Sequence, residues 1–137
     1  MEASLSRVLE FRIPADTRYI CIVRRGIRSL AEDAGFTRED VSDVEVAVSE
    51  AVANSVKHGS PDPDAAAVTV KCRTQEDCLI VEVEDESEAA SIPTCPELCN
   101  TDEETGRGVM MMHTLMDECE NSRTDHGMRI RMAKQRR

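Results

Sequence analysis

The chain has 137 residues, of which 40% are hydrophobic and 2% aromatic, so it can form one domain with an aliphatic, methionine-rich core. Its 27 acidic residues exceed its 17 basic residues and give a formal net charge of −10, which argues against direct binding of nucleic acid. No stretch approaches the roughly 18 apolar residues of a membrane span, and the N-terminus lacks the apolar core of a signal peptide, so we expect a cytoplasmic protein without membrane contact.

The N-terminal part predicts a strand followed by a helix. Residues 7–14 alternate apolar and polar side chains as a strand does, and Pro14 ends the run. Apolar residues then recur at helical spacing from Ile20 to about Ala34, and Gly35 closes this helix. The other side of the helix carries four arginines, Arg18, Arg24, Arg25 and Arg28. This basic side is either a solvated face or a docking face for an acidic partner.

The stretch from Val41 to His58 predicts the central helix of the domain. Its valines recur every three or four residues and form one apolar stripe, and Thr37 is the expected N-cap. On the side opposite the valines, Glu50 and Asn54 lie one helical turn apart among small residues, so another group could approach this face closely. The spacing alone also fits two ordinary solvated residues of a helix.

Two hairpins are predicted in the second half of the chain. Residues 67–73 pair with 78–84, and residues 119–124 pair with 127–132. Strands adjacent in sequence then pair antiparallel, and the three helices must cover one face of the sheet. We therefore expect an α+β fold in a single domain over residues 1–137. It would be a two-layer α/β sandwich with a mixed, mainly antiparallel sheet.

A long acidic segment separates the two hairpins. Residues 85–105 show no periodicity, and residues 74–106 contain 11 acidic side chains and no Lys, Arg or His. A loop of this length in a compact domain is usually functional or disordered. Gly106-Arg107-Gly108 is expected to open the third helix directly after this loop.

Three features of the chain have the residue types for chemistry at a binding site. The carboxylate of Glu50 can accept a proton from a hydroxyl group, and the amide oxygen of Asn54 suits Mg²⁺. Asp85 follows a predicted strand and can accept a hydrogen bond from the amine of a base. Gly106 and Gly108 expose backbone N–H groups at a helix start, where phosphate binds well.

The six cysteines predict no metal centre. In a cytoplasmic protein they are expected to be reduced thiols. Cys95 and Cys99 have the closest spacing, but no second Cys or His pair accompanies them at the spacing of a zinc site.

Two segments resemble a known family. VSEAVANSVKHG, over residues 48–59, looks like the N-box of the GHKL or Bergerat-fold ATPases, which include histidine kinases, gyrase B and Hsp90. TGRGVMMMHTLMDECE, over residues 105–120, looks like their second glycine box. Together with the short chain, these segments are similar to the anti-sigma-factor serine kinases of the RsbW and SpoIIAB type.

The resemblance implies a site for ATP and Mg²⁺. Glu50 would be the catalytic general base, Asn54 would bind Mg²⁺, and Asp85 would bind adenine. The segment 85–105 would form the ATP lid. The residues implied to lie near the phosphates are Lys57, His58, Gly106, Arg107 and Gly108.

The resemblance also implies the partners of the protein. Members of this family typically form homodimers, sequester a sigma factor, and use ATP to phosphorylate a serine of a STAS-domain anti-anti-sigma factor. Phosphorylation makes the antagonist dissociate, and the kinase returns to the sigma factor. We therefore expect an anti-sigma factor that is also an ATP-dependent serine kinase.

The sequence departs from the family pattern at two places. The Asp-x-Gly-x-Gly motif is replaced by the sequence DESEA, which starts at Asp85 and lacks both glycines. The last hairpin has His126-Gly127-Met128 in place of a Gly-Thr pair, and the acidic segment would repel a triphosphate. These departures leave three alternatives: a protein-binding module that needs no nucleotide, a switch kinase resembling RsbT, and a sandwich without a nucleotide site.

Overall fold

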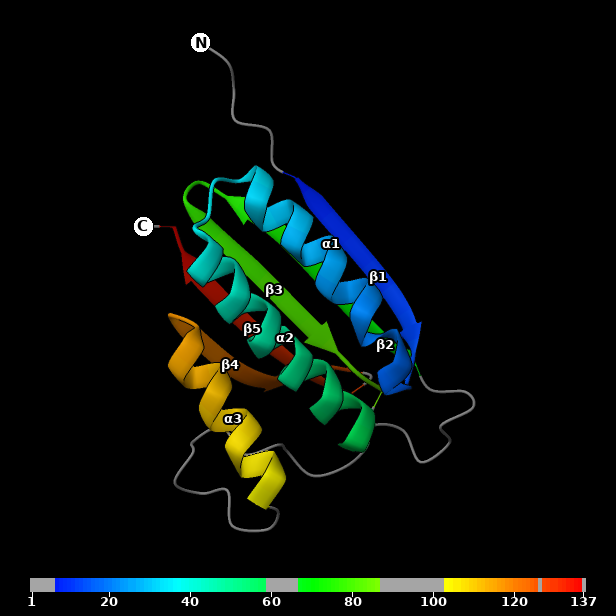
Figure 1. Cartoon of the computed structure of the whole chain (residues 1–137). Helices are drawn as coiled ribbons and strands as arrows, with labels where there is room; N and C mark the ends of the chain where they lie inside the picture. Colours follow the sequence, from blue (N-terminus) through cyan, green and yellow to red (C-terminus); the bar gives the residue numbers. More distant parts are fainter. Residues whose placement is uncertain (1–6, 59–66, 87–102, 126, 137) are drawn as a thin grey trace.

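The computed structural model describes residues 7–58, 67–86, 103–125 and 127–136 (Figure 1). The order of elements agrees with the order expected from the sequence. The elements are β1 Val8–Pro14, the 3₁₀ turn η1 Thr17–Tyr19, α1 Ile20–Asp33, α2 Arg38–His58, β2 Ala67–Gln75, β3 Cys78–Glu84, α3 Glu103–Leu115, β4 Glu118–Arg123 and β5 Met128–Gln135.

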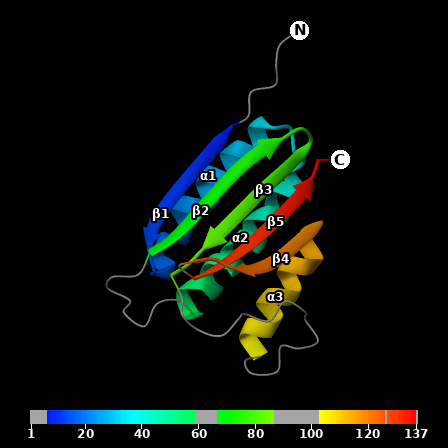
Figure 2. The ribbon, with the colours of Figure 1, turned by 180° about the vertical axis from the view of Figure 1, so that it is seen from behind.

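The five described strands form one sheet in the order β1-β2-β3-β5-β4, and all four pairings are antiparallel. The three helices cover one face of this sheet, and the view from behind shows the other face uncovered (Figures 1 and 2). The predicted α+β fold, a two-layer sandwich, is therefore confirmed. One detail differs: a mixed, mainly antiparallel sheet was expected, and the described strands pair only antiparallel. In this sheet β5 lies between β3 and β4, so β4 forms the edge.

The core between the two layers is aliphatic, as the composition predicts. Val44, Val48 and Val52 of α2 are fully buried, and they face the sheet that contributes Val81 and Met132. Burying one such side chain stabilises the fold by about 1.5–3 kcal/mol. None of the described helices is long and apolar enough to cross a membrane.

The connection between α1 and α2 is closed by local hydrogen bonds. Gly35 has a φ of +86°, and its N–H donates to Glu32 O while Phe36 N–H donates to Ala31 O. This pair of bonds is the Schellman motif, in which glycine takes the left-handed position at low cost. Thr37 Oγ1 then accepts the N–H of Asp40 at 3.1 Å, which confirms the predicted N-cap.

Gly26 lets α1 pack closely against β1, because a Cβ atom at this position would lie 2.3 Å from Cζ of the Phe11 ring. In Gly26→Ala, the steric clash should cost about 1–3 kcal/mol of folding free energy. The higher helix propensity of alanine offsets roughly 1 kcal/mol of this cost. Urea unfolding measures this difference. Ser29→Ala, an exposed change on the same helix, is the control. Equal stability of the two variants would contradict the packing described here.

An ion-pair cluster around the buried carboxylate of Glu45 joins α1 to α2. The carboxylate of Glu45, whose side chain is only 5% exposed, accepts from Arg28 Nη2 at 3.1 Å and from Arg24 Nη2 at 3.3 Å. The hydrogen bonds from Arg28 hold the pKa of Glu45 below its ordinary value, despite the opposing effect of burial. Glu45 therefore stabilises the fold in its ionised form.

This cluster predicts a pH dependence of stability. Because the pKa of Glu45 is lower in the folded than in the unfolded state, its contribution is present above the unfolded value of about 4.3 and is lost as the pH falls through the folded value. The wild type should lose more stability than Glu45→Gln between pH 7 and pH values below about 4. Urea unfolding at several pH values measures this loss, with Glu39→Gln as an exposed control on the same helix. Parallel stability curves for wild type and Glu45→Gln would refute the assignment.

The uncovered face of the sheet carries charges that alternate from strand to strand. One row of paired residues reads Glu10, Lys71, Glu82, Arg131 and Glu120 across the five strands. Opposite charges on neighbouring strands favour this register and keep the face hydrated. The cross-strand pairs include Arg73 Nη1 with Glu82 Oε1 at 2.9 Å.

Candidate functional site

The contact between α2 and α3 positions the two residues that the sequence singles out. Ala47, Ala51 and Asn54 follow one another along α2 at helical spacing, and all three are buried. Gly108 of α3 lies directly against the same side of α2. The small residues of α2 were expected to allow a close approach to this side of the helix, and α3 makes that approach.

Gly108 is the point of closest approach. A Cβ atom at this position would lie 2.7 Å from Glu50 Oε2 and 3.8 Å from Asn54 Nδ2. Only a residue without a side chain leaves the carboxylate where it is. The structure thus brings Gly108 of α3 against Glu50 and Asn54 of α2, although Gly108 is far from both in sequence.

Asn54 has the properties of a ligand-binding residue. It is 4% exposed, and its Nδ2 atom has no hydrogen-bond partner among the described residues. A buried polar atom without a partner costs about 1–3 kcal/mol, so such groups usually have a role. Because rotation of the amide by 180° exchanges oxygen and nitrogen, this position can also present an acceptor to a cation. The amide of Asn54 is therefore a suitable ligand for the cation of a metal-bound nucleotide.

Asp85 follows β3 and is held in place by β5. Its N–H donates to Met128 O at 3.0 Å, and its Oδ1 accepts from Met128 N–H at 3.1 Å. The carboxyl group is buried, with Oδ2 also shielded from water. A carboxylate fixed in this way can recognise a hydrogen-bond donor of a ligand.

A cavity of about 430 Å³ also reaches Asp85, but it opens on the uncovered face of the sheet. Its lining includes Arg12, Thr69 and Glu84, which are neighbours in one register row and point away from the helices. It is therefore separate from the α2–α3 contact that holds Glu50 and Asn54.

The other predicted site residues lie at the ends of helices. Lys57 is exposed in the last turn of α2, and His58 is the last residue of that helix, with its side chain outside the described part. The expected start of the third helix at Gly106 is wrong, because α3 already begins at Glu103. Glutamate is a favourable residue type in a first helical turn, so the helix can start before the glycines.

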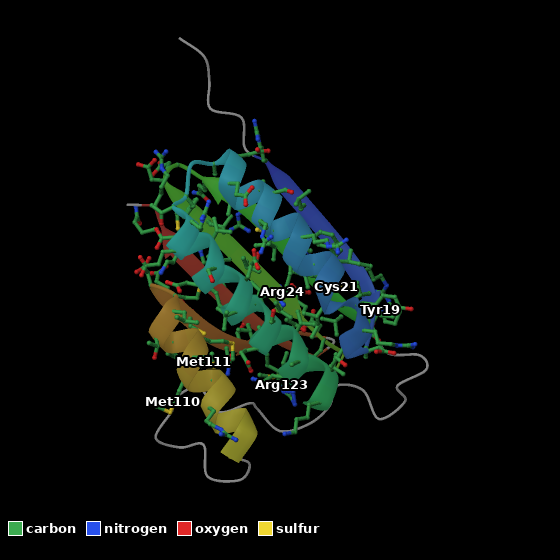
Figure 3. The ribbon with its side chains drawn as sticks, in the orientation of Figure 1. Tyr19, Cys21, Arg24, Met110, Met111 and Arg123 are labelled. Carbon is green, nitrogen blue, oxygen red and sulfur yellow. The ribbon has the colours of Figure 1, made fainter. Side chains whose placement is uncertain are left out.

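The outer face of α3 is apolar. Arg107 is exposed there and lines a groove with Met110 and Met111, which are 51% and 40% exposed (Figure 3). Arg107 thus lies on a different face of α3 from Gly108. Most of the predicted lid, residues 87–102, lies outside the described residues.

One charged residue near this site was missed by sequence reasoning. Arg123 ends β4 and pairs with Met128, the residue that also holds Asp85. Side chains alternate between the two faces of a strand, so the predicted strand 119–124 already put Arg123 on the same face as Cys119. However, the alternation does not tell which strand β4 pairs with or which face the helices cover.

The cysteines do not form a metal site within the described segments. No group of three or more His, Cys, Asp or Glu side chains is placed to hold a metal ion there. Burial raises the pKa of Cys72 to about 12 and that of Cys119 to about 11, so both remain thiols at neutral pH. Cys95 and Cys99 lie outside the described residues.

Most of the sequence is similar to proteins of known families. The model of the histidine kinase-like ATPase domain matches residues 13–134. The serine-protein kinase RsbW of Bacillus velezensis is 33% identical over 135 residues, which cover 92% of this chain and 84% of that protein. RsbW of Listeria monocytogenes serotype 4a is 32% identical over 125 residues, which cover 85% of this chain and 80% of that protein.

Solved structures share the fold. The RsbU and RsbW domains of Rv1364c from Mycobacterium tuberculosis match with a TM-score of 0.72 and 20% identity, over 95% of this chain and 32% of that chain. The histidine kinase domain of the blue-light activated kinase EL346 from Erythrobacter litoralis matches with a TM-score of 0.58 and 17% identity, over 90% of this chain and 61% of that chain.

Proposed function

The chain belongs to the histidine kinase-like ATPase domain family and, within it, to the RsbW serine-protein kinases, and from this we propose that it phosphorylates a serine of a partner protein with ATP. The partner would be a STAS-domain anti-anti-sigma factor. In the absence of that antagonist, the protein would sequester a sigma factor. This activity would take place in the cytoplasm, by a homodimer.

Each residue of the site would have a separate role in this reaction. Glu50 would orient the serine hydroxyl and accept its proton. Asn54 would offer its amide oxygen to Mg²⁺, which usually needs only one or two protein ligands beside phosphate and water. Asp85, held by Met128 N–H, would accept a hydrogen bond from the adenine amine. Bound ATP·Mg²⁺ supplies the phosphoryl group and the cation that neutralises its charge.

One observation carries the proposal. The carboxylate of Glu50 and the buried, unpartnered amide of Asn54 meet at a residue that has no side chain, with 2.7 Å between Glu50 Oε2 and a Cβ at Gly108. A purely structural helix contact would gain by burying apolar groups at such a position. A carboxylate and an amide kept there are consistent with proton transfer next to a bound cation.

A kinase assay tests the proposal directly. The protein is incubated with radiolabelled ATP, Mg²⁺ and a STAS-domain protein encoded by the same organism. We expect label on one serine of the STAS-domain protein, and none when Mg²⁺ is removed by a chelator. Absence of labelling, with both proteins folded, would support the alternative that the protein is a binding module that needs no nucleotide. The missing glycines at residues 87–89 favour this alternative.

The arginine side of α1 is the proposed docking face for an acidic partner. Arg25 is exposed and has no ion pair among the residues that the structure describes, whereas Arg24 is paired with Glu45. Figure 3 labels Cys21 and Arg24 on this helix, and Tyr19 in the turn η1 that precedes it. A small hollow lined by Cys21, Arg24 and Arg25 lies on the same side.

Charge reversal at Arg25 tests this docking face. Arg25→Glu should weaken binding of the STAS-domain protein about tenfold, because an attractive charge becomes a repulsive one at the interface. Surface plasmon resonance at two salt concentrations measures the effect. Arg131→Glu, on the uncovered face of the sheet, is the control. An unchanged affinity for Arg25→Glu would exclude this residue from the docking face.

A further inference from the structure

The face of the sheet that the helices cover is apolar along most of its length and becomes polar at one end. Val83 and Ile130 are buried there, and the next residues toward this end are Asp85 and Met128. On β4 the corresponding residue is Arg123. Arg123 therefore places a positively charged side chain on the covered face, at the same end of the sheet as Asp85.

Strand pairing fixes where Arg123 lies relative to Asp85. Met128 pairs with Arg123 on one side and is hydrogen-bonded to Asp85 on the other. Side chains of paired residues point to the same face of a sheet, and neighbouring strands lie about 4.8 Å apart. Asp85 and Arg123 therefore face the helices together, roughly 10 Å apart between their Cα atoms.

Arg123 lies on the α3 side of Asp85. Since β4 is the edge strand beyond β5, the row from Asp85 to Arg123 runs toward α3, which carries Gly108 (Figures 1 and 2). In Figure 3, the Arg123 side chain lies between the C-terminal turns of α2 and the N-terminal turns of α3. The turn after β4 is closed by Thr124 N–H to Gly127 O at 2.8 Å, so the end of this strand is held in place.

We propose that Arg123 is a phosphate-binding residue of the ATP site, an inference that rests on the proposed function. A guanidinium group binds phosphate oxygens in pairs and is always charged. In the sequence, residues 85–106 contain seven acidic side chains and no Lys, Arg or His, and the first glycine motif is missing from the same segment. Arg123, from another strand, compensates for that negative charge and replaces contacts that the glycine motif would have provided.

Calorimetric titration of the full chain tests this role, with ATP·Mg²⁺ and adenosine as the two probes. Arg123→Met should weaken ATP·Mg²⁺ binding about tenfold or more, because a charge-assisted bond to phosphate is lost, and should leave adenosine binding unchanged. Arg123→Lys should show a smaller loss, because it keeps the charge but not the paired geometry. Arg131→Met removes the same charge from the uncovered face and should bind both probes as the wild type does.

The outcomes separate this inference from the proposed function. Equal ATP·Mg²⁺ affinity of Arg123→Met and wild type would overturn the role of Arg123 and leave the kinase proposal intact. A matching loss for ATP·Mg²⁺ and adenosine would also overturn it, since the residue would then support the fold and not the phosphates. A wild type that binds neither probe would overturn both proposals. Thermal unfolding of each variant identifies any loss that comes from misfolding.

Discussion

Glu50→Gln should lower the rate of serine phosphorylation by about 10²- to 10⁴-fold and leave ATP·Mg²⁺ binding intact. Glutamine keeps the size of the side chain beside Gly108 and can still donate and accept hydrogen bonds, but it cannot take the proton of the serine hydroxyl. The loss should therefore fall on kcat and not on nucleotide affinity. Single-turnover phosphorylation and nucleotide titration measure the two quantities separately.

Glu45→Gln is the matched control for this variant. Glu45 is also a glutamate of α2, but it is paired with Arg24 and Arg28 of α1. Its replacement should reduce stability at neutral pH and leave the rate per folded molecule unchanged. Phosphorylation by Glu50→Gln at the wild-type rate would remove Glu50 from the mechanism.

Gly108→Ala should reduce phosphorylation by about 10- to 100-fold without destabilising the protein. A new Cβ would lie 2.7 Å from Glu50 Oε2, and the carboxylate is the flexible end of its side chain, so it will move away. A misplacement of about 1 Å at a reacting group costs roughly 10²-fold in rate. Alanine is also a better helix former than glycine by about 1 kcal/mol, which offsets the cost of the shift.

The control for Gly108→Ala is Thr114→Ala on the outer face of the same helix. It should change neither rate nor melting temperature by much. If Gly108→Ala retains full activity with a normal melting temperature, Glu50 does not act from the position that the structure gives it. If Gly108→Ala unfolds, the close contact is a packing requirement, and Gly108→Ser would give the same result.

The helices, turns and first hairpin were predictable because their signals are local. The valine stripe of α2, the N-cap at Thr37 and the left-handed glycine at Gly35 each act within a few residues of chain. The N-box resemblance also identified the family correctly, because Glu50 and Asn54 lie together in a conspicuous short segment.

The arrangement of distant segments was not predictable in the same way. Nothing local in β4 and β5 says that β5 inserts between β3 and β4. Nothing local in α3 says that Gly108 packs against Glu50 and Asn54 of α2. The position of Arg123 on the same face as Asp85, across β5, depends on this strand order, so it emerges only from the folded chain.

The two departures from the family pattern, at residues 85–89 and 126–128, are expected to affect nucleotide affinity more than the fold. We expect the acidic charge of residues 85–105 and the absent glycines to weaken nucleotide binding. Asn54 lies in α2 and Arg123 in β4, and Asp85 directly follows β3 and is hydrogen-bonded to Met128 of β5. A site that relies on these rigid elements can keep nucleotide binding even with an altered lid.

Calorimetric titration of the wild-type chain with ATP·Mg²⁺ tests the central claim most directly, namely that the end of the α2–α3 contact near Asn54 is a nucleotide site. We predict saturable binding that disappears in Asn54→Ala and requires Mg²⁺. No heat of binding at near-millimolar nucleotide, or equal binding by Asn54→Ala, would contradict this account and leave a protein that acts only by binding its partners.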